Sequence, residues 1–169
     1  MKSHLSVYLR ASVLDDVSEL SKAFFLSKKL HDTWIYPPSD MKKYVLQKNR
    51  YLVCLKDSDF IVGTFNISEI VRGSFHSAYL GFSAFEPHQK HGYMANGMQL
   101  LLDEAFNNLK LHRLEANIQP KNKSSLALVK KSGFIKEGFS KQYLRVGNSE
   151  WKDHERWAIV NPDWSINIS

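Results

Sequence analysis

Cysteine and long apolar runs are almost absent from this chain. Cys54 is the single cysteine among 169 residues, which excludes an internal disulfide and predicts a reducing, cytoplasmic setting. No run of about 18 apolar residues occurs, so we expect no membrane span. The opening MKSHLSVYLRAS lacks the apolar core of a secretory signal. Neither G-x-G-x-x-G nor G-x-x-x-x-G-K-[ST] occurs, which counts against dinucleotide and Walker-type sites.

The composition is that of an ordinary globular domain. Hydrophobic residues make up 43% of the chain and charged residues 24%. The length suits one core, so we predict a single domain over residues 1–169. The net charge of +6 favours a polyanionic partner or an anionic ligand, but the positive residues are scattered. A generally basic surface without a specific partner remains the alternative.

The hydrophobic pattern changes period several times along the chain. Period-two and β-branched segments predict strands over 5–11, 50–56, 59–68, 73–85 and 111–119, and two more around a Gly147-Asn148 turn. Helical spacing predicts helices over 12–30, 41–49, 93–109 and 122–134. The alternation of hairpins with crossover helices predicts a mixed sheet in an α/β or α+β domain.

The segment EPHQKHGYM connects a predicted strand to the helix at 93–109. The first N–H groups of a helix have no intrahelical acceptor, and together with the helix dipole they favour an anion. Gly92 would let the backbone approach a ligand, and Lys90 and His91 add charge, so a diphosphate suits this turn. A purely structural turn is the alternative. His88 and His91 have no Cys or acidic partner, so we predict no metal site.

Two separate motifs resemble the GNAT acetyltransferase superfamily. Gln89-x-x-Gly92 is similar to its pyrophosphate loop, Q/R-x-x-G-x-G/A, and NKSSLALVKKSGF is similar to its N-x-x-S-x-x-[LV]-[LM]-x-x-x-G-F segment. VYLRASVLDDVSEL, HRLEANIQPKNKSS and GFIKEGFSKQYLRVGNSEWKDHERWAIV resemble the RimJ/RimL group of ribosomal-protein alanine N-acetyltransferases. Two residues depart from this loop pattern. Met94 stands where the pattern has Gly or Ala, and Lys90 stands where relatives often have Gly. Their bulk would narrow the approach of a diphosphate, but the RimJ-like subgroup tolerates Met at this position, so we infer no loss of acetyl-CoA binding.

The resemblance implies a GNAT fold and acetyl transfer from acetyl-CoA to an amine, without a metal. This fold has a mixed, mostly antiparallel sheet of about seven strands, splayed at its centre and flanked by about four helices. A backbone N–H at the splay would stabilise the negative charge on the thioester oxygen. The residues that the resemblance assigns to the cofactor are Leu80, Gly81, Phe82, Ser83, Gln89, Lys90, His91, Gly92, Tyr93, Met94, Asn122 and Ser125.

The resemblance also suggests catalytic and acceptor residues. Ser125 is the candidate acid for the leaving thiolate, and Asn122 is expected to cap the helix that carries it. Tyr79 stands where relatives often carry a Glu, so the base is open among Glu69, His76, Tyr143, Asp153 and His154, acting directly or through water. Removal of the proton by water without a protein base is the further alternative. We take Tyr143 as the second catalytic candidate. The predicted acceptor groove is formed by Trp34, Tyr36, Arg72 and His76.

Three functions compete at this point. The first is acetylation of a protein N-terminus, an alanine of a ribosomal protein being the favoured acceptor. The second is acetylation of a small amine, such as a polyamine, an amino acid or an antibiotic. The third is a non-catalytic module that binds ribosomal RNA or a ribosome precursor, with only the charge in its support. A homodimer is left open in each case.

Overall fold

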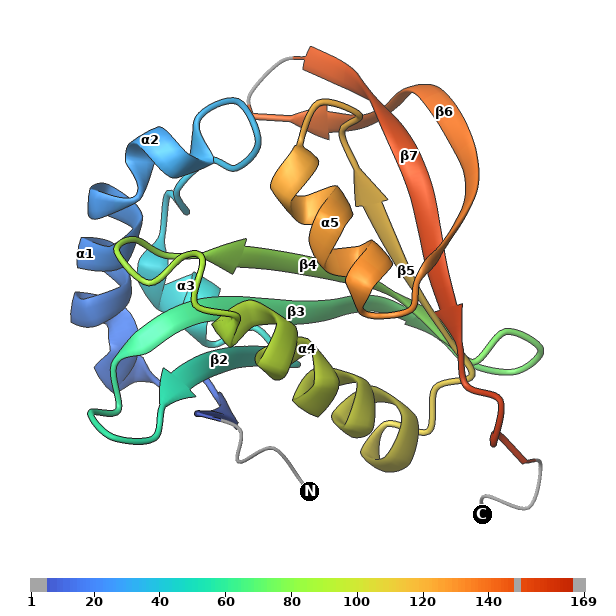
Figure 1. The fold of residues 1–169 in the computed structure, drawn as a ribbon, viewed down its shortest axis with the longest axis horizontal. Coiled ribbons are helices and arrows are strands. Elements are labelled where there is room, and N and C mark those ends of the chain that lie inside the picture. The colour runs from blue at the N-terminus through green and yellow to red at the C-terminus, as the bar shows by residue number, and fades with distance from the viewer. Residues whose placement is uncertain (1–5, 148–149, 166–169) are drawn as a thin grey trace. The chain divides into compact units, whose positions relative to one another are not determined.

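The computed structural model describes residues 6–147 and 150–165, in which seven strands form one sheet (Figure 1). The sheet order is β1-β2-β3-β4-β5-β7-β6. The strands are β1 Val7–Ala11, β2 Arg50–Leu55, β3 Ile61–Val71, β4 Ser77–Ala84, β5 Arg113–Ile118, β6 Ile135–Val146 and β7 Glu150–Val160. The helices are α1 Val17–Leu26, α2 Lys28–His31, α3 Met41–Val45, α4 Tyr93–Asp103 and α5 Lys123–Lys131.

Strand pairing confirms a mixed, mostly antiparallel sheet that splays at its centre. β1 with β2, β2 with β3, β5 with β7 and β6 with β7 are antiparallel pairs. β4 and β5 are parallel, and their pairing covers only Ser77–Tyr79 of β4. β5 continues to Ile118 and β4 to Ala84 without further pairing between them. The predicted order of elements is therefore confirmed, including the splay.

The chain forms two compact units. The first contains the described residues up to 66 together with 82–100, and the second contains 67–81 and the described residues from 101 onward. The single domain over 1–169 stays a prediction. No helix within 6–147 and 150–165 is long and apolar enough to cross a membrane.

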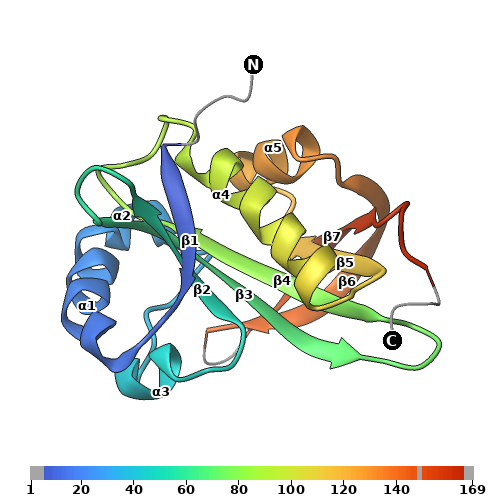
Figure 2. The same cartoon turned by 90° about the horizontal axis from the view of Figure 1, so that it is seen from below.

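In the first unit, β2 is buried along its whole length because helices cover both faces of the sheet. Leu52 and Cys54 pack in a core with Phe24 of α1. On the opposite face, a Cβ at Gly97 would come within 2.9 Å of a methyl group of Val53, so a glycine is needed for α4 to lie this close. Figure 2 shows α1 and α3 on one side of β1 to β3 and α4 on the other.

In the second unit, β5 shows the predicted period of two. Leu114, Ala116 and Ile118 are buried, while Glu115 and Asn117 are half-buried on the other face. The buried face is apolar and the other face carries the polar side chains. The strand therefore presents ionisable groups beside the splay.

Several predicted elements differ in extent from the structure, and the helix predicted over 41–49 ends at Val45. The helix predicted over 12–30 is divided into a 3-10 turn at Leu14–Asp16, then α1, then α2, with Ser27 as the junction. The helix predicted over 93–109 ends as a π-helical turn, Glu104–Asn108. Of the predicted Gly147-Asn148 turn, Gly147 has the left-handed φ of 65°, and Asn148 lies outside the described residues.

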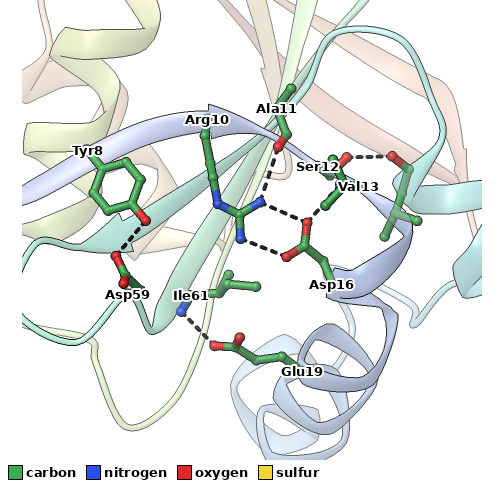
Figure 3. A network of polar contacts seen from close by, with 10 residues as sticks. Tyr8, Arg10, Ala11, Ser12, Val13, Asp16, Glu19, Asp59 and Ile61 are labelled. Carbon is green, nitrogen blue, oxygen red and sulfur yellow. Dashed lines mark hydrogen bonds and ion pairs between the residues drawn. The ribbon is translucent and has the colours of Figure 1, made fainter.

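A polar network fixes the end of β1 to the start of the first helical segment (Figure 3). The Arg10 guanidinium donates to both oxygens of Asp16, at 2.9 and 2.7 Å. The same carboxylate accepts the backbone N–H of Val13 at 2.8 Å. Asp16 thus pairs a charge and satisfies a backbone donor at one buried position.

We expect Asp16→Ala to reduce the free energy of unfolding by about 2 kcal/mol, because it leaves the Arg10 charge and the Val13 N–H without their partner. Burial alone would raise the pKa of Asp16, but the hydrogen bonds from Arg10 and Val13 and the Arg10 charge outweigh it and hold that pKa below 3.8. The stabilisation is therefore present above about pH 4 and is lost as the pH falls through the folded-state pKa.

Urea denaturation at pH 7 and at pH 3 checks this prediction, with Asp15→Ala as the matched control. Asp15 is the exposed neighbour in the same turn, so its substitution should change stability by less than about 0.5 kcal/mol. A loss for Asp16→Ala that is as large at pH 3 as at pH 7 would contradict the charge-based account.

Candidate active site

The predicted anion loop lies in the first unit, between the end of β4 and the start of α4. Gly92 has φ +77° and Lys90 has φ +66°, so two left-handed residues turn the chain into the helix. The first intrahelical bond runs from Asn96 N–H to Gly92 O at 3.1 Å. The N–H groups of residues 93–95 therefore precede the hydrogen-bonded helix and have no intrahelical acceptor. A Cβ on Gly92 would meet nothing within 4 Å, so the space beside this backbone is open.

The side chains of this loop have different surroundings. Gln89 Nε2 donates to Glu86 Oε1 at 3.2 Å, so this side chain bonds within the loop. Lys90 and His91 are exposed, and the His91 ring meets Tyr93 edge-on with 5.3 Å between centroids. The two cationic or potentially cationic groups thus remain at the surface beside the helix start, where an anionic ligand can reach them.

Met94 does not close the loop. Its sulfur occupies the space that a Cβ at Gly63 of β3 would fill. Gly63 therefore makes room for a long side chain at the position where the family pattern has Gly or Ala. The Met94 side chain is therefore directed at the sheet.

The backbone of β4 alternates between its two edges. Phe85 N–H donates to Val62 O of β3 at 3.0 Å. Because successive residues of a strand direct their N–H and C=O groups to opposite edges, those of Phe82 and Ala84 point away from β3. The pairing with β5 has already stopped at Tyr79. By the same alternation Leu80 faces the open edge, whereas Gly81 and Ser83 direct their backbone groups to the β3 side.

In the second unit, Asn122 caps α5 as predicted. Its Oδ1 accepts the Ser125 N–H and the Ser124 hydroxyl, both at 3.3 Å. Ser125 is half-buried in the first turn, and the cap uses its backbone and not its hydroxyl. The hydroxyl is therefore available for chemistry without loss of the helix start.

Two tyrosines meet at the position where the β4–β5 pairing ends. A hydrogen bond with Tyr143 raises the pKa of Tyr79, and burial and the charge of Glu115 raise it further, against a smaller opposing effect of Arg156. Glu115 is the register partner of Tyr79 on β5. Its Oε1 accepts from Arg113 Nε at 2.7 Å, so the carboxylate is held in place.

Sequence reasoning missed Glu115, Arg113 and Arg156 as parts of this cluster. The period-two pattern in LEANIQ placed Glu115 on the polar face of its strand. Only the β4–β5 register, which depends on pairing across 36 positions of sequence from Tyr79 to Glu115, brings it beside the tyrosine.

Three further candidates for the general base differ in burial and in hydrogen bonding. Asp153 Oδ1 accepts the Gln142 N–H at 2.8 Å, which uses one of its oxygens locally. His154 is buried, its Nδ1 lies 2.8 Å from Lys152 O, and its ring centroid is 6.5 Å from that of Tyr143. Glu69 is exposed near the end of β3. Tyr143 and His154 are thus brought together, and Asp153 is held by the backbone.

The predicted acceptor residues fall in both units. In the first, Trp34 is half-buried and Tyr36 is exposed, both in the loop that follows α2. In the second, Arg72 donates to the carbonyl oxygen of Leu109 at 2.6 Å, and the His76 ring lies 5.0 Å from that of Trp164. Within the described residues, no group of three or more His, Cys, Asp or Glu side chains could hold a metal ion.

Comparison with known proteins identifies the family. The model of the acetyltransferase (GNAT) domain matches residues 6–135. The chain belongs to this family. It is 38% identical over 109 residues to the ribosomal protein uS5-alanine N-acetyltransferase of Escherichia coli, a match that covers 64% of this chain and 56% of the relative. The chain thus spans little more than half the length of this curated relative.

Solved structures give the same family with wider coverage. The ribosomal-protein-S5-alanine acetyltransferase of Vibrio fischeri superimposes with a TM-score of 0.84 at 26% identity, over 96% of this chain and 97% of that one. The RimJ of Mycobacterium smegmatis, solved in complex with CoA-disulfide, gives 0.78 at 25% identity, over 91% of this chain and 81% of that one. The GNAT fold expected from the two motifs is confirmed.

The first unit has the features that a CoA ligand requires. The edge of β4 at Phe82 has no β5 partner and could pair with an amide-bearing arm as an added strand does. The turn at Gly92 precedes helix N–H groups that have no intrahelical acceptor and could bind a diphosphate, with Lys90 and His91 beside them. The residues present therefore fit the cosubstrate that the family implies.

Proposed function

We propose that this protein is an N-acetyltransferase that moves acetyl from acetyl-CoA to the N-terminal α-amine of a protein, an N-terminal alanine of a ribosomal protein being the favoured acceptor. One observation carries the donor half of the proposal: an unpaired β4 edge leads, within one unit, into a left-handed glycine at the start of a helix. The names of the Escherichia coli and Vibrio fischeri relatives support the acceptor half.

Donor binding would use the backbone more than side chains. The N–H and C=O of Phe82, and by alternation those of Leu80, would pair with the pantetheine arm. Gly92 and the first N–H groups of α4 would hold the diphosphate, with Lys90 and His91 adding charge. We also propose that Asn122 touches the pantetheine arm, a role compatible with its cap of α5.

The chemistry divides among a few groups. Bound acetyl-CoA supplies the acyl group as a thioester. A backbone N–H at the open edge, such as that of Phe82, would stabilise the oxygen that gains negative charge. Ser125 would donate a proton to the leaving sulfur. Tyr143, whose interaction with Tyr79 raises the pKa of Tyr79, would order the water that takes the proton from the amine.

An α-amine is the easier acceptor for such a site. Its pKa of about 7.7–8.0 leaves a useful neutral fraction near pH 7.5, whereas a lysine side chain at about 10.4 needs much more help. Glu115, the register partner of Tyr79, pairs with Arg113, but the same guanidinium also pairs with Glu137, so this cluster does not exclude a polyamine. The preference for a protein N-terminus over the second candidate, a small polycationic amine, therefore rests on the lower pKa of the α-amine and on the names of the relatives.

Thiol-release kinetics with acetyl-CoA test the proposal directly. Short peptides that begin with Ala, Ser or Met are compared with spermidine at pH 7.5. We expect turnover with the Ala peptide to exceed that with Met and with spermidine. Turnover with spermidine alone would overturn the protein-acceptor proposal, and tight, strongly salt-dependent ribosome binding without thiol release would favour the non-catalytic module.

Charge reversal at the loop should weaken donor binding. We expect Lys90→Glu to raise the Kd for acetyl-CoA about tenfold at low salt, and less at high salt, because an exposed charge beside the phosphates is screened. Isothermal titration at two ionic strengths measures this effect. Lys56→Glu, an exposed reversal in the turn after β2, should leave the Kd unchanged. Equal effects of both variants would place Lys90 away from the phosphates.

The proposal also covers the cellular location and the oligomeric state of the enzyme. An acceptor on a ribosomal protein or ribosome precursor implies a cytoplasmic enzyme, which agrees with the free thiol of Cys54. We propose that two copies of this protein associate as a homodimer. Analytical ultracentrifugation with and without acetyl-CoA tests it.

A further inference from the structure

Two buried polar side chains of the first unit bind the backbone where β4 ends. His31 Nε2 lies 2.6 Å from the carbonyl oxygen of Ala84. The Ser27 hydroxyl accepts the backbone N–H of Glu86 at 2.9 Å. His31 is 4% exposed and Ser27 is fully buried. We call these two residues and their two bonds the β4 clasp.

The surroundings of His31 determine its protonation state and its role as a hydrogen-bond donor. Its ring packs against Phe24 and Phe85, with centroids 5.6 and 5.8 Å apart. Burial lowers its pKa, although the Ala84 bond and the charge of Glu86 partly oppose this effect. A carbonyl oxygen can only accept, so Nε2 carries the hydrogen and His31 donates as a neutral imidazole.

The carbonyl that His31 binds belongs to the open edge of β4. Phe85 N–H faces β3, so the C=O of Ala84 faces the opposite edge, where Phe82 also points. The clasp therefore provides the Ala84 carbonyl with a hydrogen bond. The backbone N–H and C=O of Phe82 remain for hydrogen bonds with the incoming pantetheine arm. Two residues later, Ser27 fixes the first amide of the loop that leads to Gly92.

We propose that His31 and Ser27 are positioning residues that set the register of the cosubstrate arm on β4 and hold the start of the diphosphate loop. The inference rests on the proposed function, because it concerns the same donor site. With the clasp intact, an arm shifted by two residues along β4, from Phe82 to Ala84, would find the Ala84 carbonyl already bonded to His31. Without it, that shifted register becomes available and the loop start is less restrained.

The test compares His31→Leu, His31→Gln and Ser27→Ala with Leu20→Ala. Leu20 is buried in the same apolar core but touches neither bond, so Leu20→Ala destabilises the unit without breaking the clasp. Gln carries a terminal amide N–H that can replace Nε2 as the donor to Ala84. Each variant is assayed well below its own melting temperature for the Kd of acetyl-CoA and for kcat.

We expect His31→Leu to raise the Kd for acetyl-CoA roughly tenfold, and Ser27→Ala roughly threefold. His31→Gln should lie within about threefold of the wild type, and Leu20→Ala should bind normally despite a lower melting temperature. Hydrogen exchange at the Glu86 amide should accelerate in Ser27→Ala and not in Leu20→Ala.

The outcomes separate the two proposals. If the wild type fails to bind acetyl-CoA, the proposed function is wrong, whatever the exchange data show. If the wild type binds and His31→Leu binds as well as it does, or if Leu20→Ala weakens binding as much as His31→Leu, the clasp is only part of the core. Failure of Gln to restore binding would also overturn the hydrogen-bond account.

Discussion

Replacing Ser125 with Ala is expected to lower kcat about a hundredfold and to change the Kd for acetyl-CoA less than about threefold. The hydroxyl would act only when charge develops on the leaving sulfur, so its loss affects the transition state and not ground-state binding. The helix should remain intact, because Asn122 caps it through the Ser125 backbone N–H, which alanine keeps. Single-turnover thiol release and isothermal titration measure the two quantities.

Ser124→Ala is the matched control for this prediction. Ser124 lies in the same first turn, is exposed, and donates its hydroxyl to Asn122. Its loss should change kcat less than about threefold. Tyr143→Phe should also lower kcat, because Tyr143 is proposed to order the water that takes the amine proton. If Ser125→Ala has no effect on kcat, the assignment of Ser125 as the acid is wrong.

Local patterns predicted the elements of this fold because each pattern reports a local cause. The alternation in LEANIQ follows from one buried face of β5, and Asn122 caps its helix through the nearby Ser125 N–H group. The break at Ser27 was not predicted. Ser27 interrupts the helix and its hydroxyl binds Glu86, 59 positions away, an interaction that has no local signature.

The candidate site was predictable to the same extent. Gly92 adopts a positive φ at a helix start, a property that a single residue and its neighbours indicate. The packing of Met94 could not be predicted, because its space is provided by Gly63, on a different strand. The cluster of Tyr79, Tyr143 and Glu115 depends on three strands and their registers, so sequence could propose Tyr143 but not its partners.

Replacing Gly92 with Val is expected to raise the Kd for acetyl-CoA about thirtyfold or more. A β-branched residue does not tolerate a φ of +77°, so the turn must adopt another conformation. Hydrogen bonds from backbone N–H groups to a charged acceptor contribute about 1.5–3 kcal/mol each, so misdirecting one or two of them accounts for an effect of this size. No clash is involved, since a Cβ here meets nothing within 4 Å.

Gly73→Val separates loss of binding from general strain. Gly73 has φ +66° in the turn between β3 and β4, and a Cβ there also meets nothing within 4 Å. Both substitutions force a β-branched residue into the left-handed region, so they should reduce stability by similar amounts, about 1–3 kcal/mol. Only Gly92→Val should weaken donor binding. If both variants bind acetyl-CoA equally well, the diphosphate does not lie on the backbone of this turn, and the donor half of the proposed function fails with it.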